Sequence, residues 1–241
     1  MNRSRMFRLW ENKPIKTWNP VVGCYHNCVY CWARRQSKRL KRYCPYCYDF
    51  IPHIHPERLR PLRFREERVV FVVDMGDLFG DFIPDDWIIS VLEVLNNSKN
   101  VIPLFLTKNP KRYESFLELF PRNAILGATI ETNRYYSYIS KAPEPRERLK
   151  AMANLEWDRK FISIEPVLDF NLYAFLEALR EIRPIYIEIG YDNYGYVPLP
   201  EPSLQKTQSL IAELSKFTKV NVKSLRNPKH TLLDVYATYS I

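Results

Sequence analysis

The sequence predicts an α/β fold: a partial or small TIM-like barrel of six or seven β/α units, with a cysteine- and histidine-containing insertion after its first helix. Short apolar runs rich in β-branched residues alternate with stretches of helical period along most of the 241 residues. Repeated β-then-α units form right-handed crossovers over a parallel sheet. Only 6 glycines are present and neither glycine-rich phosphate motif occurs, which excludes the dinucleotide-binding and P-loop kinds of α/β fold.

The expected elements begin with a short strand near Val21 and Val22, followed by a helix over about 29–42. Pro110 suits the first turn of a later helix, and Asn171 suits the N-cap of another. Residues 43–68 have no regular period and are interpreted as the insertion; no composition break divides 1–241 into more than one domain. The remaining strands are expected at 69–75, 102–107, 124–130, 161–167, 185–190 and 220–225, and the remaining helices at 85–97, 110–120, 145–155, 171–182 and about 203–217.

Composition sets the broad class. A hydrophobic content of 46% with 14% aromatic residues excludes a disordered chain. No apolar run approaches the roughly 18 residues that a membrane helix needs. The first 13 residues, MNRSRMFRLWENK, lack the apolar core of a secretory signal. We therefore expect a cytoplasmic protein without a membrane segment.

The cysteines predict metal chemistry. All 5 lie between positions 24 and 47, and an odd number in a reducing compartment is a poor disulfide framework. Cys24, Cys28 and Cys31 fall within eight residues of the loop that leaves the first expected strand. Three thiolates can hold three irons of a cubane cluster and leave the fourth iron open, whereas structural zinc takes four ligands.

Polar side chains mark the carboxyl ends of the expected strands, where barrels of this kind carry their chemistry. The alternative is that these groups form a salt-bridged barrel mouth without a role in chemistry. The residues in these positions are Cys24, Asp74 with Asp77, Lys108, Glu131, Glu165, Asp192 and Lys223.

The C-x3-C-x2-C motif, with Tyr30 just before its last cysteine, resembles that of the radical S-adenosylmethionine (SAM) superfamily. The stretches TWNPVVGC (17–24), YCWA (30–33), HPERLRPL (55–62), DLF (77–79), LTKNP (106–110) and IEP (164–166) resemble one group within it. That group is the phage-type, uncharacterised radical-SAM-like family, distantly similar to spore photoproduct lyase. The resemblance runs over about residues 17–225.

The resemblance implies a [4Fe–4S] cluster on Cys24, Cys28 and Cys31, whose open iron is chelated by SAM. Reduction by an electron donor protein then yields a 5′-deoxyadenosyl radical. It also implies that Tyr30 lies near the adenine and that Asp74, Gly76 and Asp77 receive the amino group, although this stretch has one glycine and no glutamate. By the same resemblance Thr129 and Glu131 lie near the ribose.

Other polar residues are candidates for the reaction itself. Glu165 and Asp192 could act on the substrate or support residues that do. Tyr191, like Tyr25 and Tyr194, could donate a hydrogen atom late in the reaction.

The remaining cysteines form a second motif, C-x2-C-x5-H-x-H, made of Cys44, Cys47, His53 and His55. Four ligands of this softness suit tetrahedral zinc, which would order an insertion that has no core of its own. The alternatives are two reduced thiols without metal, an auxiliary cluster or a redox pair. His55 could instead have a strand or hydrogen-bonding role in the HPERL stretch. His26, inside the cluster loop, could tune a cluster through a hydrogen bond or be simply exposed.

The net charge of +9 has its densest run in residues 34–42, where six of nine side chains are basic, with Trp32, Tyr43, Tyr46 and Tyr48 nearby. Cations interleaved with stacking platforms suit RNA or single-stranded DNA; the alternative is a solvated helix face. The leading hypothesis is a radical SAM enzyme that acts on a nucleic acid or a nucleic-acid-derived substrate. The other is a zinc-holding nucleic-acid-binding module that retains the barrel without radical chemistry.

Overall fold

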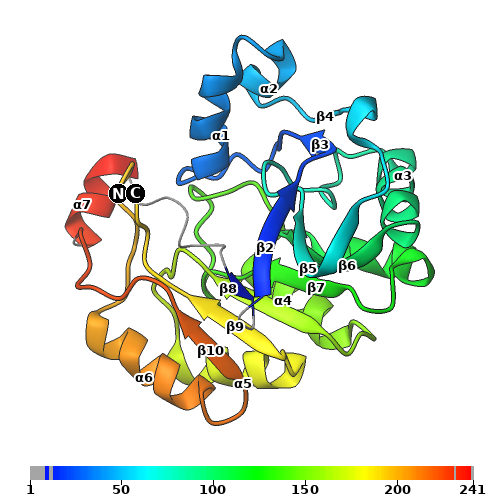
Figure 1. The fold of residues 1–241 in the computed structure, drawn as a ribbon. Helices are drawn as coiled ribbons and strands as arrows, with labels where there is room; N and C mark the ends of the chain where they lie inside the picture. Colours follow the sequence, from blue (N-terminus) through cyan, green and yellow to red (C-terminus); the bar gives the residue numbers. More distant parts are fainter. Residues whose placement is uncertain (1–8, 11–12, 231, 240–241) are drawn as a thin grey trace. The chain divides into compact units, whose positions relative to one another are not determined.

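The computed structural model describes residues 9–10, 13–230 and 232–239 (Figure 1). The chain forms two compact units, Met1–His26 with Cys31–Gly127 and Asn27–Tyr30 with Ala128–Ile241. The strands of the main sheet follow the order β1-β2-β5-β6-β7-β8-β9-β10. This order, with helices between successive strands, confirms the predicted α/β fold of partial TIM-like barrel type. Among the described residues, no helix has the length and apolar character needed to cross a membrane.

The first unit holds the amino-terminal strands. β1 (Leu9–Trp10) pairs antiparallel with β2 (Lys13–Trp18), and parallel pairing then joins β2 to β5 (Arg63–Val72) and β5 to β6 (Lys99–Thr107). α3 (Asp85–Asn96) confirms the helix expected at 85–97. It buries one face, at the 3–4-residue spacing of an amphipathic helix, through Ile88, Val91, Leu92 and Leu95.

The first parallel strand is β2, and the sequence prediction near Val21 and Val22 was wrong in this respect. Those valines form β3 (Val21–Val22), which pairs antiparallel with β4 (His53–Ile54) in a separate two-stranded sheet. β2 was not predicted because Lys16 and Thr17 at its centre are exposed and polar and because it contains Pro14, which is unusual in a strand.

The insertion is shorter and more ordered than expected. The helix expected over 29–42 is α1 (Trp32–Ser37) followed by the 3-10 turn η1 (Lys38–Leu40). After it come α2 (Pro45–Asp49) and the 3-10 turn η2 (Pro56–Arg58). The irregular part ends at Leu62, because β5 begins six residues before the predicted strand. These six residues are mostly charged and exposed, so no apolar run in the sequence indicates a strand there.

The last residues of β7 (Ile125–Thr129) open the second unit. The second unit confirms the expected alternation of strands and helices. In this unit α5 and α6 pack against each other, and α6 also contacts β10 (Figure 1). The further elements are α4 (Pro145–Asn154), β8 (Lys160–Ile164), α5 (Leu172–Ile182), β9 (Tyr186–Ile189), α6 (Leu204–Leu214), β10 (Lys219–Val222) and α7 (Leu232–Tyr239).

Three details differ from the sequence prediction. Pro110 opens η3 (Pro110–Leu119), which is a 3-10 rather than an α-helix. Asn171 occupies the N-cap of α5 but makes no capping hydrogen bond, because its side-chain oxygen accepts from Arg134 at 2.8 Å. α7 was not predicted.

The prediction of one domain over residues 1–241 stays a prediction. Most of the first 13 residues, which lack the apolar core of a secretory signal, lie outside the described part of the chain.

Candidate functional site

The segment that enters the three-cysteine loop is held by its backbone. Gly23 has φ +100°, and a Cβ there would meet the Ile51 carbonyl oxygen at 2.3 Å, so only glycine fits. Its N–H donates to the Met75 carbonyl at 3.0 Å, and the next N–H, that of Cys24, donates to the Phe50 carbonyl at 3.2 Å. Gly76 forms an isolated parallel bridge with Gly23, and a Cβ at Gly76 would meet the Gly23 carbonyl oxygen at 2.8 Å. Glycine is therefore required on both sides of this contact.

The three cysteines of the loop are partly exposed. The Cys24 sulfur accepts from the His26 N–H at 3.4 Å. Cys31 caps α1, where its sulfur accepts from the Arg34 N–H at 3.4 Å. In the second unit, the Cys28 sulfur lies 3.2 Å from the Ser140 hydroxyl. Each sulfur thus has a polar neighbour that can stabilise a thiolate.

Asp77 is buried in a network that fills both of its carboxylate oxygens. One oxygen lies 2.9 Å from His26 Nε2 and accepts from the Lys108 N–H at 2.8 Å. The other accepts from the Thr107 hydroxyl at 2.6 Å and from the Phe79 N–H at 3.1 Å. Burial alone raises the pKa of Asp77, but the hydrogen bond and charge of His26, with the other donors, outweigh it and lower the pKa. This geometry suits a carboxylate that positions the loop through His26.

Asp74 has a different environment. It is partly exposed, and one oxygen accepts from Asn19 Nδ2 at 2.6 Å, while Asn19 Oδ1 accepts from the Met75 N–H at 2.9 Å. Desolvation raises the pKa of Asp74, and the Asn19 hydrogen bond opposes that shift. Sequence reasoning missed Asn19, which the NP pair of TWNPVVGC places one residue before a turn.

In the second unit, Tyr30 and Glu131 are brought together. The Tyr30 hydroxyl donates to Glu131, which is 2% exposed and is paired with Arg148 at 2.7 Å. Burial, followed by the charge of Glu131, raises the pKa of Tyr30 well above its usual range. The buried Thr129 at the end of β7 accepts from Arg148 through its carbonyl. Glu131, Ser140 and Arg148 also line a small pocket of this unit.

A buried charge cluster joins three strand ends of the second unit. Lys223 Nζ lies 2.9 Å from Glu165 Oε2 and also pairs with Glu188. The two carboxylates raise the pKa of Lys223, against the opposing effect of its burial. Burial raises the pKa of Glu188, which Lys223 partly offsets. Glu188 was missed from the sequence, although a glutamate inside the apolar run IYIEIG is a detectable signal.

Two other sequence candidates lie after β9. The side chain of Asp192 accepts from the Tyr194 N–H at 3.1 Å and from the Gly195 N–H, as in a turn. Tyr191 is 2% exposed, and its hydroxyl contacts Thr207 Oγ1 at 2.7 Å. Tyr194 is 40% exposed.

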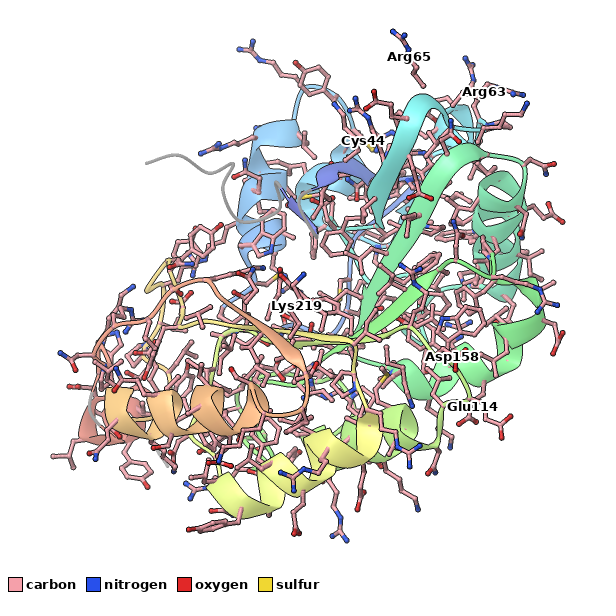
Figure 2. All side chains as sticks on the ribbon, turned by 60° about the horizontal axis from the view of Figure 1, so that its bottom comes forward. Cys44, Arg63, Arg65, Glu114, Asp158 and Lys219 are labelled. Atoms are coloured by element: carbon pink, nitrogen blue, oxygen red, sulfur yellow. The ribbon has the colours of Figure 1, made fainter. Side chains whose placement is uncertain are left out.

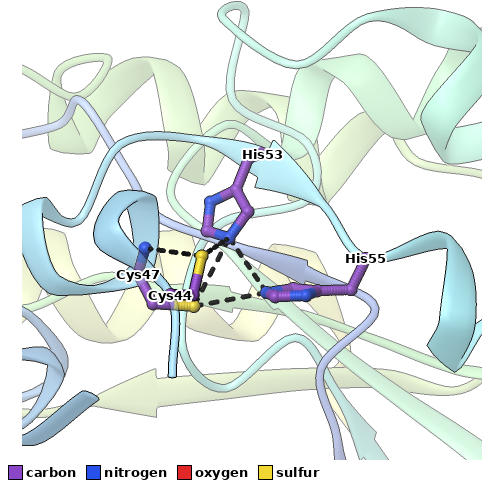
Figure 3. Close-up of side chains that lie close together, drawn as sticks. All are labelled: Cys44, Cys47, His53 and His55. Atoms are coloured by element: carbon purple, nitrogen blue, oxygen red, sulfur yellow. Dashed lines mark hydrogen bonds between the residues drawn. The ribbon is translucent and has the colours of Figure 1, made fainter. Parts of the chain in front are cut away.

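The insertion brings Cys44, Cys47, His53 and His55 together (Figure 3). One ligand atom from each lies within 4.8 Å of the other three, so this Cys2His2 cluster could hold a metal ion. Burial and the neighbouring Cys44 raise the pKa of the Cys47 thiol to about 11.

The basic segment 34–42 is mostly solvent-exposed. Lys38 is held over the Tyr48 ring at 4.2 Å, and Arg34 donates to the Cys24 carbonyl at 3.3 Å. Tyr43 and Tyr46 are 84% and 58% exposed. Figure 2 shows two further cations of the same unit, Arg63 and Arg65, projecting away from the exposed first half of β5. The remaining exposed cations of the segment are Arg35, Arg39, Lys41 and Arg42.

Similar solved structures are chains of spore photoproduct lyase. A double mutant with bound AdoMet and dinucleoside spore photoproduct has a TM-score of 0.52 at 11% identity, over 90% of this chain and 66% of the lyase. A single mutant gives 0.54 at 10% identity, over 92% and 66%. The lyase complexed with dinucleoside spore photoproduct gives 0.51 at 11% identity, over 83% and 61%. The chain thus spans about two thirds of the lyase length or less, and at these identities the likeness shows that the two share a fold.

No curated protein matches this sequence. Residues 10–178 match the family described as "Protein of unknown function (DUF5131)", and this region contains both cysteine motifs. Since the match covers well over half of its length, the chain belongs to the DUF5131 family.

Proposed function

We propose that this protein is a radical SAM enzyme whose [4Fe–4S] cluster is held by Cys24, Cys28 and Cys31. The observation that carries the proposal is the C-x3-C-x2-C motif, placed after the first parallel strand of a radical-SAM-like fold. One of the lyase structures with this fold contains AdoMet, which favours the same cofactor here. Barrels of this kind carry their chemistry at the carboxyl ends of their strands, where this loop begins.

The donor set of the loop fits such a cluster. Three cysteine sulfurs match a cubane that keeps one open iron, and amide N–H groups lie against two of these sulfurs. When bound, the reduced cluster and SAM would supply a 5′-deoxyadenosyl radical. The electron would come from a separate donor protein. The chain's own residues would hold the cluster loop and exclude water from the radical.

We assign the cofactor's amino group to Asp74 rather than Asp77. The four donors around Asp77 occupy both of its oxygens, whereas Asp74 is partly exposed beside Gly76. A carboxylate in this position can accept from an ammonium group. Thr129, Glu131 and Tyr30 are assigned to the ribose and adenine side of SAM, where Glu131, which accepts from both Tyr30 and Arg148, would hold the Tyr30 ring in place.

The substrate that the surface favours is a nucleic acid or a nucleic-acid-derived molecule. Exposed cations of the 34–42 segment follow the cluster loop directly, with Tyr43 and Tyr46 as exposed stacking surfaces. Among the residues proposed for chemistry, Glu165 is held by Lys223 at 2.9 Å, and we keep it as the carboxylate that could act on the substrate. The burial of Tyr191 favours a packing role, which leaves Tyr194 as the better candidate for hydrogen-atom donation. The cytoplasm, which keeps thiols reduced, suits these sites.

Anaerobic reconstitution tests the proposal. We expect about four irons per chain and the release of 5′-deoxyadenosine from SAM on reduction. Cys28→Ala should abolish that release, while Tyr173→Phe, on an exposed ring of α5, should leave it unchanged. Protein that holds zinc alone after reconstitution, or a Cys28→Ala variant with full activity, would contradict the proposal.

The second candidate is a zinc-holding nucleic-acid-binding module without radical chemistry. The Cys2His2 cluster in the same insertion as the exposed tyrosines favours it. It predicts that Cys28→Ala binds RNA as well as the unaltered chain and that neither releases 5′-deoxyadenosine. Reduction assays and RNA titrations on the same two preparations separate the candidates.

A further inference from the structure

The two histidines of the Cys2His2 cluster are both oriented by acceptors on their outer side. His53 Nδ1 lies 2.7 Å from the Ile51 carbonyl oxygen, and His55 Nδ1 lies 2.9 Å from Glu57 Oε1. A carbonyl oxygen or an ionised carboxylate can only accept, so each Nδ1 donates a proton, and in a neutral imidazole ring each Nε2 then presents a lone pair. Fixing the tautomer through a carbonyl or carboxylate is the usual outer contact of a metal-bound histidine.

These lone pairs face each other. His53 Nε2 and His55 Nε2 are 2.9 Å apart, and in these tautomers neither nitrogen has a proton to donate across that gap. Cys47 Sγ lies 3.4 Å from the first nitrogen and 3.2 Å from the second, and Cys44 Sγ lies 3.4 Å from the first. Two sulfurs and two imidazole nitrogens that converge on one point form a donor set that suits a metal cation (Figure 3).

The dimensions and donor types identify the cation. Zn–S bonds of about 2.3 Å and Zn–N bonds of about 2.0–2.1 Å place tetrahedral ligands about 3.3–3.8 Å apart. Two of the three sulfur–nitrogen separations, both 3.4 Å, lie in this range. The third, 3.2 Å, and the nitrogen–nitrogen separation of 2.9 Å are shorter, so these ligand atoms would move slightly apart on binding zinc. A two-iron cluster with two cysteines and two histidines puts the pairs on different irons, so sulfur and nitrogen would lie much farther apart. Thiolate and imidazole together favour zinc over magnesium or calcium.

The local backbone supports the same assignment. Cys44 is the N-cap of α2, and its sulfur accepts from the Cys47 N–H at 3.4 Å, so this turn brings the two sulfurs to one side. Phe50 then closes the turn in the left-handed conformation, at φ 58°. The chain returns directly to His53 on β4.

The cluster is tied to the segment that leads to Cys24. His53 pairs with Val22 across β3 and β4, and the His55 N–H donates to the Pro20 carbonyl at 2.7 Å. On the other side, Phe50 accepts from the Cys24 N–H at 3.2 Å. Residues 20–24 are therefore bonded to chain segments on both sides of the ligand turn.

We infer that Cys44, Cys47, His53 and His55 bind one structural Zn²⁺, which braces the backbone of residues 20–24. Zinc binding itself does not depend on the proposed function. The consequence for a cluster at Cys24 does rest on it: loss of zinc should loosen the loop and lower iron occupancy.

The first experiment uses the full chain with Cys24, Cys28 and Cys31 replaced by alanine, so that no iron cluster interferes. We expect one zinc per chain by elemental analysis. Cys44→Ser and His53→Gln in this background should lower zinc to the level of the buffer, whereas His230→Gln should retain it. Absence of zinc in the parent, retention of zinc in both ligand variants, or a Cys44–Cys47 disulfide found by mass spectrometry would overturn the inference.

A second measurement keeps the inference testable if a ligand variant does not fold. Co²⁺ added to metal-free protein should give the intense d–d bands of a tetrahedral thiolate site, and octahedral bands would overturn the zinc assignment. Chelation should speed hydrogen exchange at the Cys24 and His55 amides and leave the Gly190 amide unchanged. Unchanged exchange at Cys24 would overturn the bracing. Stoichiometric zinc without any SAM cleavage would refute the proposed function alone.

Discussion

Asp77 provides the sharpest test of how the loop is held. Its carboxylate is 5% exposed and receives four contacts of 2.6 to 3.1 Å. Asp77→Ala removes the carboxylate that contacts three buried groups, the Thr107 hydroxyl, the Phe79 N–H and the His26 ring. Loss of a buried hydrogen-bond partner costs about 1–3 kcal/mol for each group, so the three together cost at least about 3–5 kcal/mol. We therefore expect the free energy of unfolding to fall by about 3–5 kcal/mol, and Tm by about 6–20 °C at about 2–4 °C per kcal/mol.

The pH dependence gives the direction of the effect independently. The pKa of Asp77 is lower in the folded than in the unfolded chain, so its stabilisation is present above the unfolded pKa of about 3.9. That contribution is lost as pH falls toward the folded pKa. Urea titrations of the unaltered chain and of Asp77→Ala at several pH values should therefore converge at acid pH. Asp86→Ala, on the exposed start of α3, is the control. A loss below 1 kcal/mol, or a gap that does not change with pH, would refute this reasoning.

Three further changes have defined outcomes. Gly23→Ala should cost at least about 1–3 kcal/mol in chemical denaturation, because alanine is strained at φ +100° and its Cβ meets Ile51. Lys223→Met should cost about 3–5 kcal/mol at neutral pH, because Glu165 and Glu188 lose their buried cation. The third change replaces Arg39, Lys41 and Arg42 with alanine. If RNA binds the basic segment, the plot of log K for RNA binding against log salt concentration should become shallower by about 0.7 for each phosphate contact that is lost.

Matched variants separate these effects from general damage. Lys219→Met removes an exposed lysine at the start of β10 and should change stability by less than about 0.5 kcal/mol. A charge-matched control for RNA binding places alanine at Lys111, Arg122 and Lys150, which are exposed elsewhere. An equal change of salt slope in both triple variants would argue against a dedicated surface at 34–42. A stable Gly23→Ala variant would contradict the close approach to Ile51.

Some features of the fold are visible in short stretches of sequence. α3 and α5 carry apolar residues at helical spacing, and β8 and β9 are short apolar runs, because these elements bury a face or both faces. Alternation of such runs with helices was sufficient to predict the α/β class. The spacing of the five cysteines likewise predicted two separate metal motifs, since ligand spacing is local.

Other features depend on residues that are distant in the chain. β2 has exposed polar residues at its centre and the first half of β5 is charged, so only their parallel pairing identifies them as strands of the sheet. Whether Asp77 is open to a ligand depends on donors about 30 to 50 residues away, at Thr107 and His26.

The two metal motifs show the same division. The sequence by itself determined which residues can ligate metal, because thiols and imidazoles are intrinsically suited to it. Only the tertiary structure decided that His53 and His55 turn their unprotonated Nε2 atoms toward Cys47, because Ile51 and Glu57 fix the opposite nitrogens. The tertiary structure also brought Glu165 and Glu188 into contact with the same lysine, Lys223. Both arise from packing between separate strands and turns, and local periodicity does not encode such contacts.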